Sequence, residues 1–375
     1  MSEIHSFGTD AIPCHAFNAS RSKVALSPNN NEVHIYQRDG IKWTLSHNLN
    51  QHDLRITSID WAANSNRIVT CSADRNAYVW SPVDGQWKPT LVLLRINRAA
   101  TCVRWSPKED KFAVGSGAKL VSVCYFEEAN DWWVSKHIKK PIRSTVTSID
   151  WHPNNVLLAC GSTDFKARIF SGFIKEVDKR EGESTPWGGK CSTGALVGEF
   201  SNGGGGWVHG VSFSPDGNRL AWVSHDSSIS VADANRGMAV STVRTRFLPY
   251  LSCVWSAPDL IVAAGHDCCP MLFQYDMSRA ELKYVDKVDK TLKKEVDGFS
   301  AMRKFKDMDK RGMSVENNIS DTQLDSIHQN TISEIRVYSG SKSGADKIST
   351  VGVDGLMVVW DLKSLEGSLK GLRIA

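Results

Sequence analysis

Apolar and polar residues alternate in short stretches that recur along most of the chain. In residues 56–61 (ITSIDW), Thr57, Ile59 and Trp61 fall on one face of an extended strand. The same spacing returns in residues 146–151 (VTSIDW). Each stretch is followed by a second apolar stretch, a turn and a third strand. The pattern therefore predicts an array of similar β-strand units.

The spacing of these units predicts their architecture. The residue that closes the third strand serves as a marker and occurs at Tyr36, Trp80, Tyr125, Phe170, Ala232, Phe273 and Trp360. Successive markers are 44, 45, 45, 62, 41 and 87 residues apart. Units of roughly 40–45 residues with four short strands are typical of propeller blades. We therefore expect an all-β, seven-bladed propeller, one domain over residues 1–375, closed by residues 3–7 pairing with the blade of Trp360.

A turn aspartate lies six residues before five of the markers, at Asp74, Asp164, Asp226, Asp267 and Asp354. A carboxylate suits a tight turn because it accepts hydrogen bonds from nearby backbone N–H groups. Two units also resemble WD-repeat propellers in a set of four residues, which we call the tetrad: His52, Thr70, Asp74 and Trp80, and again His328, Thr350, Asp354 and Trp360. The resemblance implies that the aspartate orients the histidine, the histidine binds the hydroxyl, and the hydroxyl meets the indole. This implied role is structural.

The composition indicates one large folded domain. The chain has 375 residues, of which 41% are hydrophobic, and a formal net charge of +4, which is too small to indicate nucleic-acid binding. No apolar run is long enough to span a membrane, and residues 1–16 lack the layout of a signal peptide. We expect a protein of the cytosol or nucleus that inserts in no membrane.

Cysteine usage agrees with that compartment. The nine cysteines are an odd number, lie mostly within strand patterns and form no Cys-x-x-Cys pair. Buried free thiols are the prediction. The neighbours Cys268 and Cys269 lie in a blade turn without a second pair at zinc spacing. We expect no metal and no cofactor.

Candidate catalytic groups have simpler explanations. His225–Asp226 and His266–Asp267 resemble a base with its orienting carboxylate, but each aspartate is the turn residue of its own unit. Residues 115–119 (GSGAK) lack the spacing of a phosphate-binding loop. We find no catalytic constellation and predict a protein that is not an enzyme.

The two long intervals predict insertions. The first, residues 176–206, is polar and Gly-rich, with Trp187 predicted to be a packed aromatic in a surface loop. The second, residues 277–327, contains FSAMRKFKDMDKRG, in which Phe299, Met302, Phe305 and Met308 recur at every third position. This spacing predicts a short amphipathic helix over about residues 299–311.

The opposite face of this helix is basic and includes Arg303 and Lys306. An isolated helix of this length is marginal in water, so it needs a surface to pack on. That surface could be the propeller itself or a partner; we favour a partner with an acidic surface, contacted by Phe299, Met302, Arg303, Phe305, Lys306 and Met308. A second basic stretch, with Lys136, Lys139, Lys140 and Arg143, is either a solvated rim or a partner-binding rim.

Several longer segments carry a resemblance to one family. RINRAA (residues 95–100) and NDWWVSKHIKKPIRSTV (residues 130–146) are specific, and DKFAVGSG, GWVHGVSFS and the terminal WDLKSLE agree with them. With these segments the chain resembles the WD-repeat subunit of the actin-related protein 2/3 complex, along essentially its whole length. The resemblance implies a seven-bladed WD-repeat propeller that scaffolds neighbouring subunits without catalysis of its own.

The resemblance also implies partners: other subunits of the complex, the actin filament and nucleation-promoting factors, in the cytoplasmic actin cytoskeleton. The extended loop before the last blade, here FSAMRKFKDMDKR, is the element linked to the mother filament and to those factors. The alternative is a stand-alone WD-repeat adaptor for peptides or ubiquitin-pathway partners. A propeller enzyme or a nucleic-acid binder is a more distant alternative.

Overall fold

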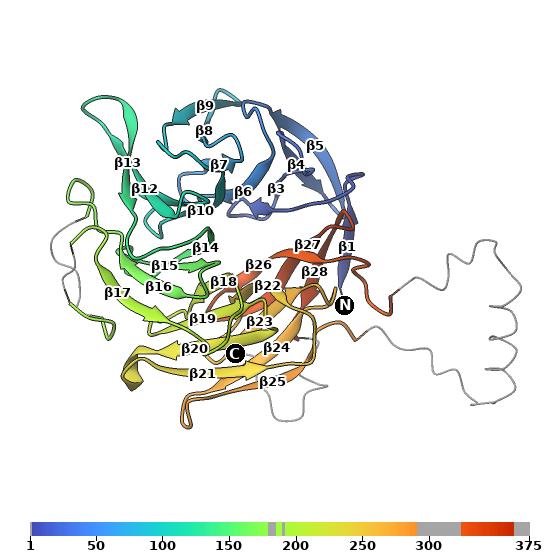
Figure 1. The fold of residues 1–375 in the computed structure, drawn as a ribbon. Coiled ribbons are helices and arrows are strands. Elements are labelled where there is room, and N and C mark those ends of the chain that lie inside the picture. The colour runs from blue at the N-terminus through green and yellow to red at the C-terminus, as the bar shows by residue number, and fades with distance from the viewer. Residues whose placement is uncertain (1, 179–184, 190–191, 291–323, 364–375) are drawn as a thin grey trace, which may run out of the picture.

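The computed structural model describes residues 2–178, 185–189, 192–290 and 324–363, and these form seven four-stranded antiparallel sheets arranged in a ring (Figure 1). The first strand of each blade contacts the first strand of the next, from β2 through β6, β10, β14, β18, β22 and β26 back to β2. The predicted seven-bladed, all-β propeller is therefore confirmed.

The strands follow chain order within each blade. Blade 1 consists of β2 (His15–Phe17), β3 (Lys23–Leu26), β4 (Val33–Asp39) and β5 (Lys42–Leu49). Blade 2 consists of β6 (Ile56–Trp61), β7 (Ile68–Ser72), β8 (Ala77–Val83) and β9 (Gln86–Val92). Blade 3 consists of β10 (Ala100–Trp105), β11 (Lys111–Ser116), β12 (Leu120–Glu127) and β13 (Trp132–Ile138). Blade 4 consists of β14 (Val146–Trp151), β15 (Leu157–Ser162), β16 (Ala167–Ser171) and β17 (Leu196–Phe200).

The remaining blades continue around the ring. Blade 5 consists of β18 (Val208–Phe213), β19 (Arg219–Ser224), β20 (Ser228–Asp233) and β21 (Ala239–Arg244), with the 3₁₀ turn η1 (Ala234–Arg236) before β21. Blade 6 consists of β22 (Tyr250–Trp255), β23 (Leu260–Gly265), β24 (Met271–Asp276) and β25 (Glu281–Lys287). Blade 7 consists of β26 (Ile332–Ser341), β27 (Gly344–Gly352) and β28 (Leu356–Asp361), and its outer strand is β1 (Glu3–Ser6).

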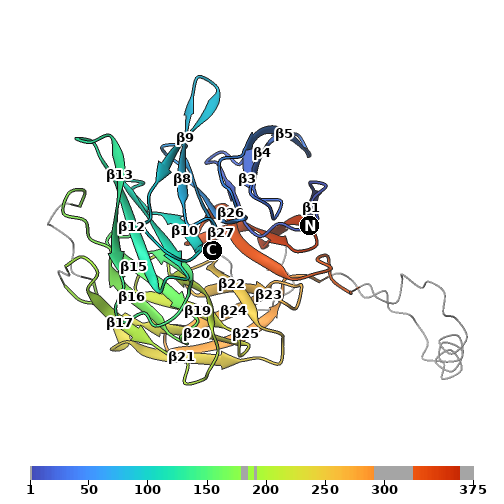
Figure 2. The same ribbon diagram turned by 45° about the horizontal axis from the view of Figure 1, so that its top comes forward.

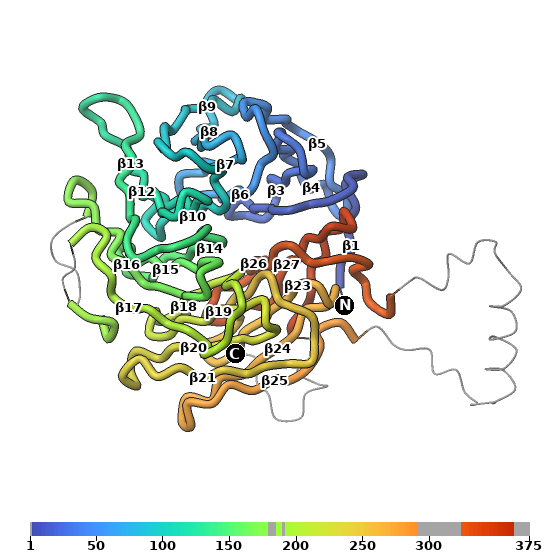
Figure 3. Tube along the Cα trace, viewed as in Figure 1, coloured from blue at the N-terminus to red at the C-terminus, as the bar shows by residue number. Residues whose placement is uncertain are grey.

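Strand β1 closes the ring. It pairs antiparallel with β28, from Glu3 opposite Val359 to Ser6 opposite Leu356, so the first and last strands of the chain lie side by side (Figure 3). The Glu3 carboxylate also accepts hydrogen bonds from Arg38 of blade 1 (3.0 Å) and Lys347 of blade 7 (2.8 Å). The predicted closure is confirmed, and it removes the open sheet edge that an unclosed ring would expose.

Repeated side-chain contacts hold neighbouring blades together. Thr57 of blade 2 donates to the carbonyl of Ala100 in blade 3 (2.9 Å), and Thr101 of blade 3 donates to the carbonyl of Val146 in blade 4 (2.6 Å). Ser333 makes the same bond from blade 7 to Ile12 (2.6 Å). The alternation seen in the sequence thus places a hydroxyl at each of these joints, beside apolar residues that are buried between the sheets.

One turn position recurs on one face of the ring, between the second and third strands. The residue there has a left-handed backbone at Arg75, Lys119, Phe165, Ser227, Cys268 and Gly355, with φ between 59° and 73°. A side chain disfavours this conformation, so glycine would be the least strained residue. Blades 2, 3 and 4 nevertheless have arginine, lysine and phenylalanine at this position.

Both predicted insertion ranges include the outer strand of a blade. β17 lies within residues 176–206 and β25 lies within residues 277–327. Outer strands are only partly buried, so their hydrophobic alternation is weak and the third-strand marker does not detect them. In the first range Trp187 is buried and donates its indole N–H to the carbonyl of Gly217 (2.7 Å). The predicted helix over residues 299–311 lies outside the described residues.

In the tilted view the outer strands β9, β13, β17 and β21 lie along the rim of the ring, because each is the last strand of its blade (Figure 2). In the part of the chain that the structure describes, no helix combines the length and the hydrophobicity that crossing a bilayer requires.

Candidate functional site

The structure brings the four residues of each tetrad together. In blade 2, His52 Nδ1 lies 2.7 Å from Asp74 Oδ2, His52 Nε2 lies 2.9 Å from Thr70 Oγ1, and Trp80 Nε1 lies 3.0 Å from the same Oγ1. Blade 7 repeats the arrangement. His328 Nδ1 lies 2.9 Å from Asp354 Oδ2, and His328 Nε2 lies 2.7 Å from Thr350 Oγ1. Trp360 Nε1 lies 2.8 Å from the same Oγ1.

The hydrogen positions in the first tetrad follow from the chemistry of its members. The indole N–H of Trp80 can only donate, so Thr70 Oγ1 accepts it. The Thr70 hydroxyl then donates to His52 Nε2, which leaves the imidazole hydrogen on Nδ1 for Asp74. Burial lowers the pKa of His52, and the charge of Asp74 opposes this only in part, so the imidazole is neutral at pH 7. The imidazole nitrogens, the hydroxyl and the indole N–H all form hydrogen bonds within the tetrad, which suits a structural role.

The other turn aspartates are also engaged in bonds within their own blades. Asp226 accepts hydrogen bonds from Asn202 (3.0 Å) and Ser228 (2.6 Å), while the neighbouring His225 bonds His209 instead (2.9 Å). Asp267 accepts the backbone N–H of Leu248 (2.8 Å). Neither carboxylate orients the histidine beside it in the sequence, so these pairs lack the geometry of an acid–base couple.

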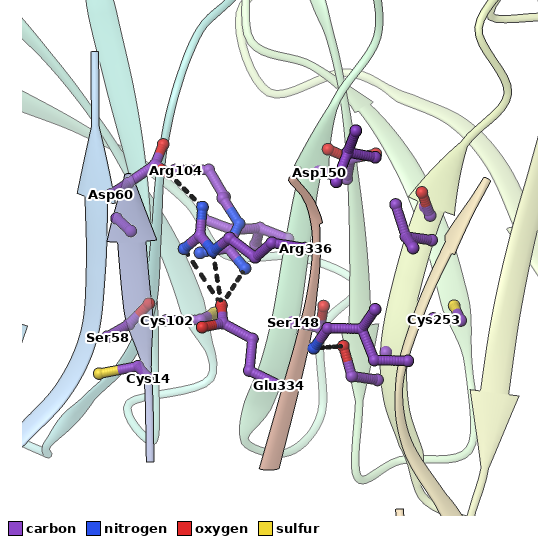
Figure 4. A pocket seen from close by; sticks show the side chains of 18 of the residues that line it. Cys14, Ser58, Asp60, Cys102, Arg104, Ser148, Asp150, Cys253, Glu334 and Arg336 are labelled. Carbon is purple, nitrogen blue, oxygen red and sulfur yellow. Dashed lines mark hydrogen bonds and ion pairs between the residues drawn. The ribbon is translucent and has the colours of Figure 1, made fainter. Parts of the chain in front are cut away.

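A charged cluster lines the central channel of the ring, a cavity of about 530 Å³ (Figure 4). Glu334 Oε1 accepts from Arg104 (2.8 Å) and Arg336 (3.1 Å), and Glu334 Oε2 accepts from the backbone N–H of His15 (2.9 Å). Arg336 also donates to Asp60 (2.6 Å). The cluster therefore joins blades 1, 2, 3 and 7 across the axis.

The central carboxylate of this cluster is ionised. Glu334 is buried, which by itself would raise its pKa, but Arg336, His15 and Arg104 outweigh burial and hold the pKa well below the ordinary value of 4.5. Burial would lower the pKa of Arg104, but the carboxylates of Glu334 and Asp60 outweigh burial and raise it. A second pair, Lys342 with Asp150 (2.6 Å), spans from blade 7 to blade 4. These channel charges neutralise one another and serve the fold.

Sequence reasoning missed the channel cluster, although a signal was present. Four charged residues share one register position, directly after an apolar residue of the first strand of their blade: Asp60 after Ile59, Arg104 after Val103, Asp150 after Ile149 and Arg336 after Ile335. A charged side chain at that position in four blades of a propeller points toward the common axis, where opposite charges can meet.

The residues of the predicted basic rim have two different environments in the structure. Lys136 on β13 donates to Glu176 (2.7 Å) and lies 5.2 Å from the centre of the Tyr125 ring, so it is already engaged at the edge of the ring. Lys139, Lys140 and Arg143 lie in the loop before β14 and are exposed. The predicted partner-binding residues Phe299, Met302, Arg303, Phe305, Lys306 and Met308 lie outside the described residues.

The cysteines that the structure describes are buried free thiols: Cys14, Cys71, Cys102, Cys124, Cys160, Cys253, Cys268 and Cys269. Burial raises the pKa of Cys269 to about 12, so its thiol stays protonated and unreactive at neutral pH. Within the described ranges, no group of three or more His, Cys, Asp or Glu side chains is arranged to hold a metal ion.

A family model and several relatives match the chain. The model described as "WD domain, G-beta repeat" matches residues 43–81 and 135–171, each running from the outer strand of one blade through three strands of the next. "Actin-related protein 2/3 complex subunit 1A-B" of Xenopus laevis is 57% identical over 372 residues, covering 99% of both chains.

More distant relatives match over nearly the same length. "Actin-related protein 2/3 complex subunit 1" of Schizosaccharomyces pombe is 44% identical over 93% of this chain and 96% of its own. "Actin-related protein 2/3 complex subunit 1A" of Arabidopsis thaliana is 42% identical over 98% of each chain. The similarity thus extends across all seven blades and is not limited to generic repeat motifs.

Proposed function

Because this chain belongs to the family of actin-related protein 2/3 complex subunit 1, we propose that it is a non-catalytic scaffold subunit of that complex. In this role it supports actin filament nucleation and branching by contacting neighbouring subunits, the mother filament and nucleation-promoting factors, in the cytoplasmic actin cytoskeleton. The observation that carries the proposal is the 57% identity over 99% of both chains to a relative named as this subunit.

The geometry supports a scaffold. The ring is closed by β1, and polar groups that could otherwise react, such as His52 and Glu334, are bonded to neighbours in the same chain. A rigid closed body with many surface loops can hold several partners in fixed relative positions. The loops, not the blade walls, are then the places where partners bind.

We assign the filament contact to the predicted helix of residues 299–311. Its apolar stripe, with Phe299, Met302, Phe305 and Met308, would supply burial, and Arg303 and Lys306 would attract an acidic surface. In the chain, this range lies between β25 of blade 6 and β26 of blade 7.

Native purification tests the scaffold role. The chain is tagged at its genomic locus and isolated from cells under mild conditions, and the associated proteins are identified by mass spectrometry. We expect co-purification in a fixed assembly that includes two actin-related proteins. A chain that purifies alone, or with ubiquitin-pathway proteins, would instead support a stand-alone WD-repeat adaptor.

Branching assays test the filament contact. Phe299, Met302 and Phe305 are replaced together by serine in one variant, and Arg303→Glu with Lys306→Glu forms a second. We expect normal assembly of the complex and a reduced number of branches per filament length, with the charge reversal more sensitive to salt because exposed charges are screened. Normal branching by both variants would exclude this helix as the contact.

A further inference from the structure

Three histidines lie close together where blades 5 and 6 meet beside the central channel. His209 comes from β18 and lines the channel, His225 lies in the turn between β19 and β20, and His266 lies in the corresponding turn of blade 6. The ring centres of His209 and His225 are 5.1 Å apart, and those of His225 and His266 are 6.4 Å apart. We call these three residues the histidine cluster.

The repeat does not account for this cluster. In blades 2 and 7 the turn aspartate holds the histidine of a tetrad, whereas in blade 5 Asp226 is held by Asn202 (3.0 Å) and Ser228 (2.6 Å). Blade 5 therefore fixes its turn without a histidine. His209 and His225 are additional to that bonding, so their contact with one another needs a separate explanation.

A hydrogen bond joins the first two members of the cluster, with His209 Nε2 2.9 Å from His225 Nδ1. A neutral imidazole has one N–H group and one free lone pair, so one ring donates and the other accepts. The pair can take up one proton and keep this bond, because a charged ring still donates to a neutral one. With two protons both facing nitrogens carry a hydrogen atom, and the contact becomes a repulsion between like charges.

No carboxylate compensates this repulsion. Four other histidines each contact a carboxylate oxygen within 3.1 Å, namely His15, His34, His52 and His328. In the part of the chain that the structure describes, none of the three imidazoles of the cluster forms an ion pair. The acidic residues of the two turns have other partners, since Asp226 faces Arg244 (3.4 Å) and Asp267 accepts the backbone N–H of Leu248 (2.8 Å). The exposed Arg246 adds positive charge to the same loops.

The strands packed against β18 supply no unpaired negative charge either. β14 contributes Asp150, which already accepts a hydrogen bond from Lys342 (2.6 Å). β15 and β22 contribute Cys160 and Cys253, and burial raises the pKa of both thiols, so they stay neutral. The hydroxyl of Tyr250 on β22 is neutral for the same reason, because burial raises its pKa as well. A second proton on the cluster therefore meets only positive charge.

Trp207 covers the exposed side of the pair. Its ring centre lies 5.5 Å from that of His225, with 34° between the ring planes, and 6.4 Å from that of His209. Its backbone carbonyl also accepts the N–H of His225 (2.8 Å). An aromatic face attracts a nearby cation, so Trp207 stabilises the first proton on His225. The indole itself is 49% exposed, so its environment reports on the pair beneath it.

We propose that the histidine cluster is a proton-sensitive latch, which holds the turn of blade 5 beside the channel while the cluster carries at most one proton and releases it with the second. Release separates His225 and Trp207 from His209 and opens this side of the channel to solvent. The latch needs no ligand, because its two states differ only in the protons that the imidazoles carry.

The energetic direction agrees with this geometry. Burial, followed by the charges of His225 and His266, lowers the pKa of His209 from 6.5 to about 4. The closed latch therefore resists the second proton, whereas a released His209 in solvent accepts it readily. Because the released form binds this proton more tightly, the ratio of released to closed latch rises by up to about tenfold per pH unit as the pH falls from 6.5 toward 4.

This inference goes beyond the proposed function, since the latch belongs to blades 5 and 6 and the proposed filament contact to residues 299–311. Its tests use the full-length chain without any partner. A chain that co-purifies with the complex but lacks the latch would overturn only the inference.

The coupling between the imidazoles is tested by following the protonation of His209 in the folded chain. NMR of histidines labelled with carbon-13 in the imidazole ring gives one titration curve per residue, and each signal is assigned by its loss in a single His→Gln variant. We expect His209 to be mainly neutral at pH 5 in the wild type. In His225→Gln it should take up its proton at a higher pH, because one repelling charge is gone.

His47→Gln is the matched control. This histidine lies on β5 of blade 1, outside the cluster, so the titration of His209 should not change in this variant. A His209 that is mainly protonated at pH 5 in the wild type would overturn the proposal. The same holds for a titration of His209 that is identical in the wild type and in His225→Gln.

Release of the turn has its own readout at Trp207. Fluorine NMR of the chain labelled with 5-fluorotryptophan separates the indoles, Trp207→Phe assigns the signal, and a dissolved paramagnetic agent measures the exposure of each indole. We expect the exposure of Trp207 to rise several-fold between pH 7 and pH 5 in the wild type. In His209→Gln the rise should disappear, because glutamine takes up no proton.

Trp132 is the internal control for this measurement. It is 58% exposed on β13 of blade 3, and its exposure should not change with pH in any variant. If His209→Gln does not fold, His225→Gln gives the same comparison, because the latch needs both imidazoles. No rise at Trp207 in the wild type, or an equal rise in the wild type and the glutamine variant, would overturn the proposal.

Discussion

Two groups of cations in this protein differ in what surrounds them. The channel cations Arg104, Arg336 and Lys342 each contact a carboxylate within 2.8 Å, and the central carboxylate is buried. A second group, Arg55, Arg75 and Arg98 in loops of blades 2 and 3, is exposed and forms no ion pair with a described residue. The first group holds distant blades together, whereas the second lies in solvent and holds no blade to another.

The difference separates stability from binding. Breaking a buried ion pair leaves an uncompensated charge in a region of low dielectric, which is strongly destabilising. Changing an exposed unpaired charge alters the free energy of unfolding very little but alters the attraction of a charged partner. The two groups should therefore respond in opposite ways to substitution.

The largest loss of stability is expected from Glu334→Ala. The substitution leaves Arg104, Arg336 and His15 without their common acceptor, at a cost of about 3–5 kcal/mol in the free energy of unfolding, measured by urea denaturation. Glu334→Gln, which keeps the shape and one acceptor oxygen, should cost less and stays measurable if the alanine variant does not fold. A loss below about 1 kcal/mol for the alanine variant would show that the cluster contributes little.

The same carboxylate predicts a pH dependence. Its pKa in the folded chain lies below the unfolded value of 4.5, so its contribution is fully present above that value and is lost as the pH falls through and below it. The difference in unfolding free energy between wild type and Glu334→Gln should therefore stay constant from pH 7 to about 5 and shrink as the pH is lowered further toward 3. A difference that stays constant over this range would contradict the shifted pKa.

Removal of residues 1–11 should have the next largest effect. It deletes β1, the two ion pairs of Glu3 and the packing of Phe7 beside Tyr36, for a loss of roughly 2–4 kcal/mol. Differential scanning calorimetry of the truncated chain measures it. Ile4→Thr, at an exposed position of β1, is the control and should change little. An unchanged melting temperature after truncation would contradict closure by β1.

The tetrads should contribute less per residue. His52→Ala or Asp354→Ala leaves buried polar partners unmet, at about 1–3 kcal/mol each. Asp267→Ala is a matched control at the same turn position, where the carboxylate accepts one backbone N–H, and should cost under about 1 kcal/mol. Chemical denaturation of the three variants gives the comparison. Equal losses in all three would show that the histidine, threonine and tryptophan add nothing to the turn.

The repeat could be predicted from the sequence because it depends on local features. Period-two alternation located the first strands, the residues that close the third strands gave the blade spacing, and the spacing gave seven blades and their closure. The outer strands β17 and β25 were not predicted, because most of their residues are exposed or only partly buried. Such strands show little alternation of apolar and polar residues.

The channel cluster could not be predicted in the same way. Arg104 and Glu334 are 230 residues apart, and their contact depends on the closure of the whole ring. The predicted basic rim was defined by a run of charges, whereas the structure pairs Lys136 with Glu176 and leaves Lys139, Lys140 and Arg143 exposed in the loop before β14. A run of charges in the sequence does not show which of them will find a partner from a distant segment.

The separation between the two groups of cations is tested most directly by measuring the free energy of unfolding of two variants by urea denaturation. Arg336→Met should lower it by about 3 kcal/mol or more, because Glu334 and Asp60 lose a buried partner. The triple variant Arg55→Glu, Arg75→Glu and Arg98→Glu should stay within about 0.5 kcal/mol of wild type, because its cations are exposed and unpaired. A triple variant as unstable as Arg336→Met would contradict the separation.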